Sequence, residues 1–119
     1  MQSMENHRIY RLPFRDLYAM YIQKAERKQR TAAEVDQIIL WLTGYSEQQF
    51  QEHLRSGTAL QPFLDDAAAF NPKADLVTGV ICGVRIENLD HPTMKRIRIL
   101  DKLIDELAKG RAMAKILRQ

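Results

Sequence analysis

Apolar residues recur at helical spacing along most of the chain. The first complete stripe has the offsets 0, 3, 4, 7, 8 and 11, which place side chains on one face of an amphipathic helix. It comprises Phe14, Leu17, Tyr18, Tyr21, Ile22 and Ala25. This pattern predicts a first helix from about Phe14 to Gln29.

A second helix is predicted between Thr31 and Thr43 from its start, its buried face and its end. Thr31 is followed three residues later by Glu34, the spacing of a capping box in which each side chain bonds the other residue's backbone N–H. Gly44 lacks a Cβ atom and therefore suits the left-handed conformation that commonly ends a helix. The apolar face between these ends comprises Val35, Ile38, Ile39 and Leu42, with Trp41 beside it.

Two shorter helices are predicted next. Ser46 and Gln49 form a second capping box, so a third helix should run to about Ser56. A fourth helix is predicted over about 59–70. Pro62 is compatible with this helix because proline is tolerated in the first turn.

The stretch after residue 70 supports two interpretations. Asn71 followed by Pro72 is a favourable cap and first helical residue, and it predicts a helix to about Gly83 with an extended link to Asp90. The β-branched residues and glycines of the same stretch are equally typical of a strand pair. We favour the helix because the cap signal is strong and no partner strand is visible elsewhere in the sequence.

The carboxyl-terminal part predicts a long helix that opens at Pro92. Gly110 interrupts the pattern, and residues 112–117 supply a further helical turn or two. The long helix carries one apolar seam, Met94, Ile97, Leu100, Ile104 and Leu107, with Leu103 alongside. Its width suggests a surface through which copies of the chain could form a homo-oligomer.

These elements predict an all-α fold. Short helices joined by short turns favour a compact orthogonal bundle of about six to seven helices, with a small extended segment near 84–90. Residues 1–13 show little periodicity and are predicted to form an extended amino-terminal arm. The length of 119 residues and the absence of a Pro/Gly/Ser-rich linker indicate a single domain, 1–119.

Composition narrows the class of protein. Hydrophobic residues at 45% and charged residues at 28% are typical of a soluble globular protein. No run approaches the roughly 18 apolar residues of a membrane span, and the first residues lack the apolar core of a signal peptide, so we expect no membrane association. The single cysteine, Cys82, permits no internal disulfide and suits the cytoplasm; we expect it to be a small buried hydrophobe. The three scattered histidines and the absence of paired cysteines predict no metal site and no cofactor.

Three long strings of the sequence carry a resemblance to a known family. They are HRIYRLPFRDLYAMYIQKAERKQRTAAEVDQIILWLTGY, NPKADLVTGVICGVRIE and MKRIRILDKLIDELAKGRAMAKILR. Through them the chain resembles the bacterial family catalogued as domain of unknown function 2200. The resemblance implies a small, mostly helical bacterial protein of uncharacterised function. It implies no reaction, ligand or catalytic residue.

A basic cluster at the end of the first helix is the first candidate binding site. Its members are Lys24, Arg27, Lys28 and Arg30. The first three lie at i, i+3 and i+4 and so share a helical face, where an anion or the phosphates of a nucleic acid could bind. The alternative is that these cations only complement the dipole of the helix. The net charge of +3 is too small to decide between the two.

An alternative site combines aromatic and polar residues. Tyr21, Trp41, Tyr45, Thr78 and Arg85 could line a pocket for a small molecule, as a binding protein or an enzyme would need. Arg85 would then point inward, and the tyrosine hydroxyls would be free. Aromatic residues at helical spacing are, however, more often part of a core. The sequence assigns no catalytic residue, and it favours a binding or interaction module over an enzyme.

Overall fold

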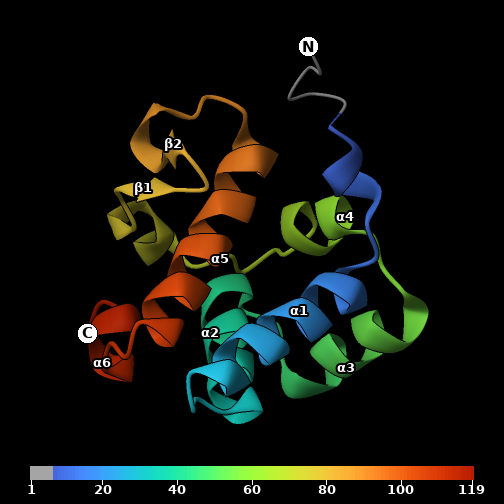
Figure 1. Cartoon of the computed structure of the whole chain (residues 1–119). Coiled ribbons are helices and arrows are strands. Elements are labelled where there is room, and N and C mark those ends of the chain that lie inside the picture. The colour runs from blue at the N-terminus through green and yellow to red at the C-terminus, as the bar shows by residue number, and fades with distance from the viewer. Residues whose placement is uncertain (1–6) are drawn as a thin grey trace.

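The computed structural model describes residues 7–119 as a helical bundle that carries one small hairpin (Figure 1). The helices are α1 (Phe14–Arg27), α2 (Ala32–Thr43), α3 (Glu47–Ser56), α4 (Leu60–Asp65), α5 (Pro92–Ala108) and α6 (Met113–Ile116). The strands are β1 (Val80–Ile81) and β2 (Val84–Arg85). The predicted mostly helical bundle is confirmed, as is a small extended segment, although the segment begins earlier than expected.

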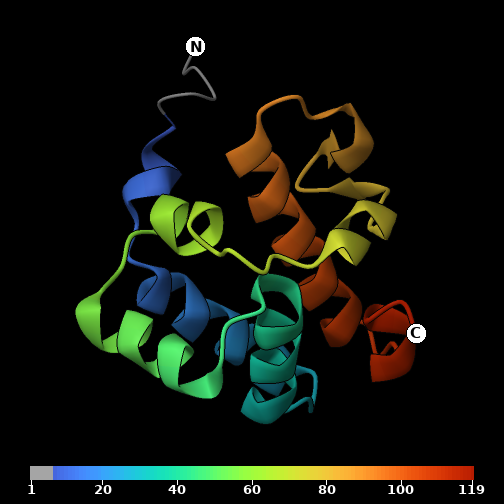
Figure 2. The ribbon, with the colours of Figure 1, turned by 180° about the vertical axis from the view of Figure 1, so that it is seen from behind.

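Helices α1, α2 and α5 contact one another and enclose the centre of the core. Figure 2 shows α5 running beside α2, with the hairpin alongside α5 and α6 at its carboxyl-terminal end. Helix α3 packs on α1, α4 packs on α5, and α6 closes the far end of α5. The core therefore draws on residues from nearly the whole described chain.

The helix ends of α2 and α3 form as their sequence signals predict. The Thr31 hydroxyl accepts the Glu34 N–H at 3.1 Å, and the Glu34 carboxylate accepts the Thr31 N–H at 3.0 Å. Ser46 and Gln49 bond in the same reciprocal way. Gly44 ends α2 at φ 74°, in the left-handed region. Both capping boxes are confirmed.

Helix α1 ends two residues earlier than predicted, at Arg27. Gln29 adopts a positive φ of 63°, and the Arg30 N–H donates to the Ala25 carbonyl at 2.9 Å. This hydrogen-bond pattern terminates helices efficiently, although glycine is the usual residue at the left-handed position.

The fourth helix is half as long as predicted, because the chain leaves it at Asp65 to cross the end of α2. There the Asn71 N–H donates to the Leu42 carbonyl at 2.8 Å. The Ala69 carbonyl lies so close to Gly44 that a Cβ atom there would be 2.3 Å from its oxygen. Residues 69–71 therefore lie against the end of α2 instead of continuing the helix.

The helix predicted from Asn71 to Gly83 is wrong. Pro72–Leu76 form only a 3₁₀ turn, and β1 and β2 then pair as an antiparallel hairpin in which Ile81 faces Val84. The two loop residues, Cys82 and Gly83, have φ values of 52° and 77°. Two consecutive positive φ values characterise the type I′ turn that suits a two-residue hairpin loop. The strand-pair interpretation is correct for residues 80–85, and a 3₁₀ turn at Ile86–Asn88 leads toward α5.

The apolar seam of α5 lies inside the bundle. Met94, Ile97, Leu100, Leu103, Ile104 and Leu107 are all buried. The surface expected for self-association is therefore covered within one chain, so this seam is not available for a homo-oligomer.

The described part of the amino-terminal arm, residues 7–13, is extended at Leu12 and Pro13, where Pro13 forms an antiparallel bridge with Ala59, but not at residues 8–11. Arg8–Arg11 form a 3₁₀ turn that buries Tyr10, and the Leu60 N–H donates to the Leu12 carbonyl at 2.8 Å. The remaining arm residues, 1–6, lie outside the described part of the chain. Among residues 7–119, no helix is both long enough and apolar enough to cross a bilayer.

Candidate functional site

The structure separates the four cations of the predicted basic cluster. Lys24 donates to Asp105 at 3.2 Å, and Arg30 forms an ion pair with Glu34 at 2.7 Å. Arg30 also donates to the Leu107 and Arg111 carbonyls at 3.3 and 2.9 Å, so it fastens the end of α1 to the end of α5. Arg30 is therefore committed to contacts within the fold. Lys24 forms one ion pair, but its side chain remains partly exposed.

Arg27 and Lys28 are the exposed members of the cluster. Neither forms an ion pair with a carboxylate among residues 7–119. Lys28 is the residue that follows the end of α1, whereas Arg27 lines a groove together with Lys24. The cluster therefore contributes two of its four residues to one concavity.

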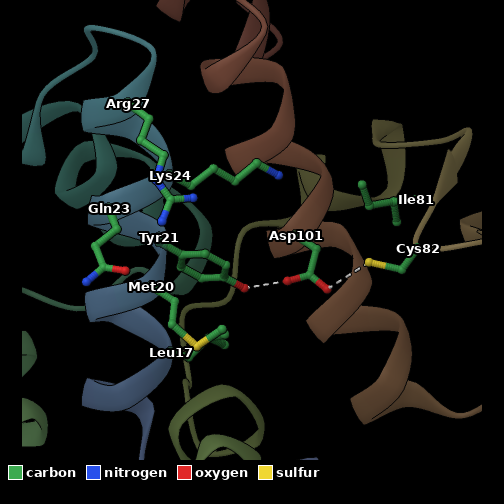
Figure 3. A pocket seen from close by; sticks show the side chains of 9 residues that line it. All are labelled: Leu17, Met20, Tyr21, Gln23, Lys24, Arg27, Ile81, Cys82 and Asp101. Carbon is green, nitrogen blue, oxygen red and sulfur yellow. Dashed lines mark hydrogen bonds between the residues drawn. The ribbon is translucent and has the colours of Figure 1, made fainter.

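This groove lies between α1, the hairpin and α5, and we call it the α1–α5 groove (Figure 3). Its volume is about 360 Å³. It is lined by Leu17, Met20, Tyr21, Gln23, Lys24, Arg27, Ile81, Cys82 and Asp101. The cations and Gln23 come from α1, the apolar side chains come from α1 and β1, and the carboxylate comes from α5.

Tyr21 and Asp101 join the two helices across the groove. The buried Tyr21 hydroxyl donates to Asp101 Oδ1 at 2.5 Å, and Arg98 donates to Oδ2 of the same carboxylate at 3.0 Å. Burial, together with the charge of Asp101, holds the pKa of Tyr21 well above its usual value of 10.0. Tyr21 therefore stays a neutral hydrogen-bond donor, and Arg98 compensates the charge of Asp101.

Two residues at the mouth of the groove are more exposed to solvent than is usual for their residue type. Met20 is 59% exposed although it is a large apolar residue. Cys82 is exposed at the tip of the hairpin, with its Sγ 3.9 Å from Asp101 Oδ2, so the expectation of a buried cysteine is wrong. The physical reason is the type I′ turn, which places Cys82 in the two-residue loop instead of in a buried helix face.

The second predicted site does not come together around one cavity. Tyr21 lies in the α1–α5 groove, whereas Trp41 lines a different hollow on α2. The Tyr45 hydroxyl donates to the Phe63 carbonyl at 2.6 Å and so is not free. Thr78 is exposed near the hairpin. Arg85 points outward, with its side chain 54% exposed and 3.6 Å from Glu87, instead of inward as predicted.

Sequence reasoning missed Asp101, Cys82, Ile81 and Met20 as lining residues. Asp101 forms an ion pair with Arg98, three positions earlier on the same helix. The useful signal was the strand-pair alternative for residues 74–87, because a Cys-Gly turn would have placed the thiol at a hairpin tip. Among residues 7–119, no group of three or more His, Cys, Asp or Glu side chains is arranged to hold a metal ion.

The protein is a small helical bundle with a short hairpin packed against α5. The α1–α5 groove beside this hairpin is lined by two cations, one carboxylate and several apolar side chains. The profile of a family described as uncharacterized protein conserved in bacteria, domain of unknown function 2200, matches residues 8–118. The chain belongs to this family.

A solved relative has the same fold. The crystal structure of the uncharacterized protein SP1917 superposes with a TM-score of 0.88 at 38% sequence identity, covering 98% of this chain and 93% of that chain. No curated protein matches the sequence. The comparisons agree on the fold and assign no activity.

Proposed function

We propose that this protein is a binding module for a small amphipathic anion, held in the α1–α5 groove. The ligand class is a carboxylate or phosphate monoester on a short apolar chain. The observation that carries the proposal is that Arg27 and Lys24 line the same concavity as Leu17, Met20 and Ile81. A ligand pocket commonly combines apolar walls with a few polar groups that fix orientation.

The charges around the groove suit an anion. Arg27 has no ion-pair partner among residues 7–119 and is the principal candidate for the contact. The Lys24 side chain is 44% exposed, so it can contact a ligand as well as its ion-pair partner Asp105. The one carboxylate in the lining, Asp101, already accepts hydrogen bonds from Arg98 and Tyr21, which offsets its repulsion of a second anion.

The same geometry favours binding over catalysis. Tyr21 and Asp101 are hydrogen-bonded to each other, and the raised pKa of Tyr21 keeps it protonated, so that no phenolate is available as a general base. It also favours a small ligand over nucleic acid, because the phosphates of a nucleic acid require several free cations on one face. Two of the four basic residues here are instead engaged within the fold.

Titration of the full chain with octanoate and octyl phosphate, followed by amide chemical shifts in NMR, tests the proposal. Saturable shifts should map to α1, the hairpin and the facing part of α5. Arg27→Gln should weaken binding by about 10-fold or more, because a hydrogen bond to a charged group contributes about 1.5–3 kcal/mol. Lys28→Gln, one residue further on and outside the groove, should change affinity less than about twofold.

Two results would refute the proposal. One is equal binding of octanol and octanoate, which would remove the role of the anion. The other is an equal loss of affinity in Arg27→Gln and Lys28→Gln, which would indicate only a diffuse charge effect at the end of α1.

A further inference from the structure

A second concavity lies on α2, away from the α1–α5 groove, and we call it the Trp41 hollow. Its volume is about 620 Å³. Five lining residues come from α2, one from the first turn of α3, and two from the chain after α6. They are Ala33, Asp36, Gln37, Leu40, Trp41, Glu47, Leu117 and Gln119. None of them lines the α1–α5 groove.

The apolar part of the hollow consists of side chains that the core only half covers. Leu40 and Trp41 pack against the core but stay partly exposed, and the buried Leu117 lines the same hollow. Trp41 is the single tryptophan of the chain. Tryptophan is enriched at the centres of protein interfaces, where its large surface contributes much of the binding energy.

The charge of the hollow is opposite in sign to the net charge of the protein. Its only charged side chains are Asp36 and Glu47. Neither forms an ion pair with a cation among residues 7–119, while the whole chain carries +3. The Tyr18 hydroxyl donates to Asp36 at 2.5 Å, which holds this carboxylate in place.

The local environment disfavours two negative charges at this position. Burial raises the pKa of Asp36, the hydrogen bond from Tyr18 opposes this effect, and the nearby charge of Glu47 raises the pKa further. A cation placed in the hollow would relieve the repulsion. The face of an exposed tryptophan also attracts ammonium and guanidinium groups.

We propose that the Trp41 hollow is a docking surface for a partner protein that presents an amphipathic segment, with a Lys or Arg side chain next to apolar residues. The apolar side chains would cover Leu40 and Trp41. The cation would lie between Asp36, Glu47 and the indole. The hollow spans three segments of the chain, which is more surface than one small cation would cover.

Trp41 itself reports on occupancy, because it is the single tryptophan. The full chain is titrated with a synthetic tryptophan-free amphipathic helix of leucine and lysine, and separately with the same helix carrying glutamate in place of lysine. The lysine peptide should produce a saturable change in Trp41 emission. The glutamate peptide should bind at least 10-fold more weakly.

Matched variants separate this site from general charge attraction. The double variant Asp36→Asn and Glu47→Gln removes both charges but keeps an acceptor oxygen for Tyr18, and it should weaken the lysine peptide at least 10-fold. The control, Asp75→Asn with Asp90→Asn, removes two exposed charges outside the hollow and should weaken it less than twofold. Circular dichroism and thermal melts of both double variants should overlay those of the parent chain.

Three outcomes would overturn the proposal. An equal loss of affinity in both double variants would show that only net charge matters. Binding of spermine as tight as binding of the peptide would identify a small-cation site instead of a protein-docking surface. A change in Trp41 emission with protein concentration alone would identify a second copy of the chain as the occupant. Octanoate serves as an internal check, because occupancy of the α1–α5 groove should leave Trp41 emission unchanged.

Discussion

The helices between residues 14 and 65 and the segment between residues 71 and 91 are held in place in different ways. In the helices, Phe14, Phe50 and Phe63 are fully buried, and the rings of Phe14 and Phe63 stack at 3.8 Å between centroids. In the segment, Leu76 and Val80 are 58% and 50% exposed. Burial of apolar side chains is the main stabilising contribution in these helices, and the capping boxes of α2 and α3 stabilise them further.

The segment instead depends on hydrogen bonds to a few points. Lys102 of α5 donates to the Val80 carbonyl at 3.1 Å, and the Gly79 N–H donates to the Glu87 carboxylate at 2.9 Å. Val77, Ile86 and Leu89 supply its buried anchors. The α1–α5 groove lies where the two regions meet, so one wall is built from α1 and the other from a hairpin that tertiary contacts position.

The largest difference in stability between the two regions is expected when one apolar side chain is truncated in each. Phe63→Ala should lower the free energy of unfolding by about 3–5 kcal/mol, because it removes a fully buried ring and leaves a cavity. Val80→Ala should change it by less than about 0.5 kcal/mol, as for other exposed positions. Urea denaturation measures both values. Similar losses in the two variants would break the distinction between the regions.

A smaller contrast is expected from the glycines of the two regions. Alanine at either Gly44 or Gly83 faces a left-handed backbone conformation, at a cost of about 1–2 kcal/mol. A Cβ atom at Gly44 would also overlap the Ala69 carbonyl oxygen at 2.3 Å, whereas a Cβ atom at Gly83 would meet nothing within 4 Å. Gly44→Ala should therefore be clearly the more destabilising variant in thermal melts. The reverse order would show that the Ala69 carbonyl does not approach Gly44 closely in solution.

The capping threonine of α2 should matter more than a threonine in the segment. Thr31→Ala removes an acceptor for the N–H groups of the first turn and should cost about 1 kcal/mol. Thr78→Ala, at an exposed position, should cost less than about 0.5 kcal/mol. Chemical denaturation of the two variants in parallel checks this, and an equal cost would indicate that the capping box adds nothing to the stability of α2.

The smallest contrast concerns acid stability. The hydrogen bond from Arg30, aided by those from Thr31, lowers the pKa of Glu34 from its usual value of 4.5 to about 2. Because the folded-state pKa is the lower one, this carboxylate stabilises the fold fully above pH 4.5. The contribution is lost as pH falls from 4.5 toward 2.

Glu87 of the segment provides the matched comparison. Hydrogen bonds from backbone N–H groups, chiefly that of Gly79, lower its pKa in the same direction, but its side chain is exposed to solvent. Glu34→Gln should therefore flatten the dependence of stability on pH below 4.5 more than Glu87→Gln does. Denaturation midpoints measured between pH 2 and 7 test this expectation, which an equal flattening in both variants would contradict.

The sequence was sufficient to predict α1, α2, α3 and α5, because their signals are local. A capping box lies within one turn of the chain. An apolar stripe identifies the buried face of a helix even when the packing partner is unknown. Thr31 to Gly44 and the seam of α5 formed as their patterns indicate. The groove was predictable only in part: Lys24 and Arg27 were singled out as a basic cluster and Tyr21 as part of a different pocket, and the structure places all three in one groove.

Tertiary structure decided the rest, because those features depend on residues far apart in the chain. Asp101 meets Tyr21 across 80 positions, and Arg30 is withdrawn from the basic cluster by carbonyls of residues 107 and 111. The hairpin formed where a strong helix cap suggested a helix, because Lys102 and the turn at Cys82 and Gly83 stabilise the extended pairing. Local patterns determined α1, α2, α3 and α5. The packing of α1, α5 and the hairpin determined which side chains share a site.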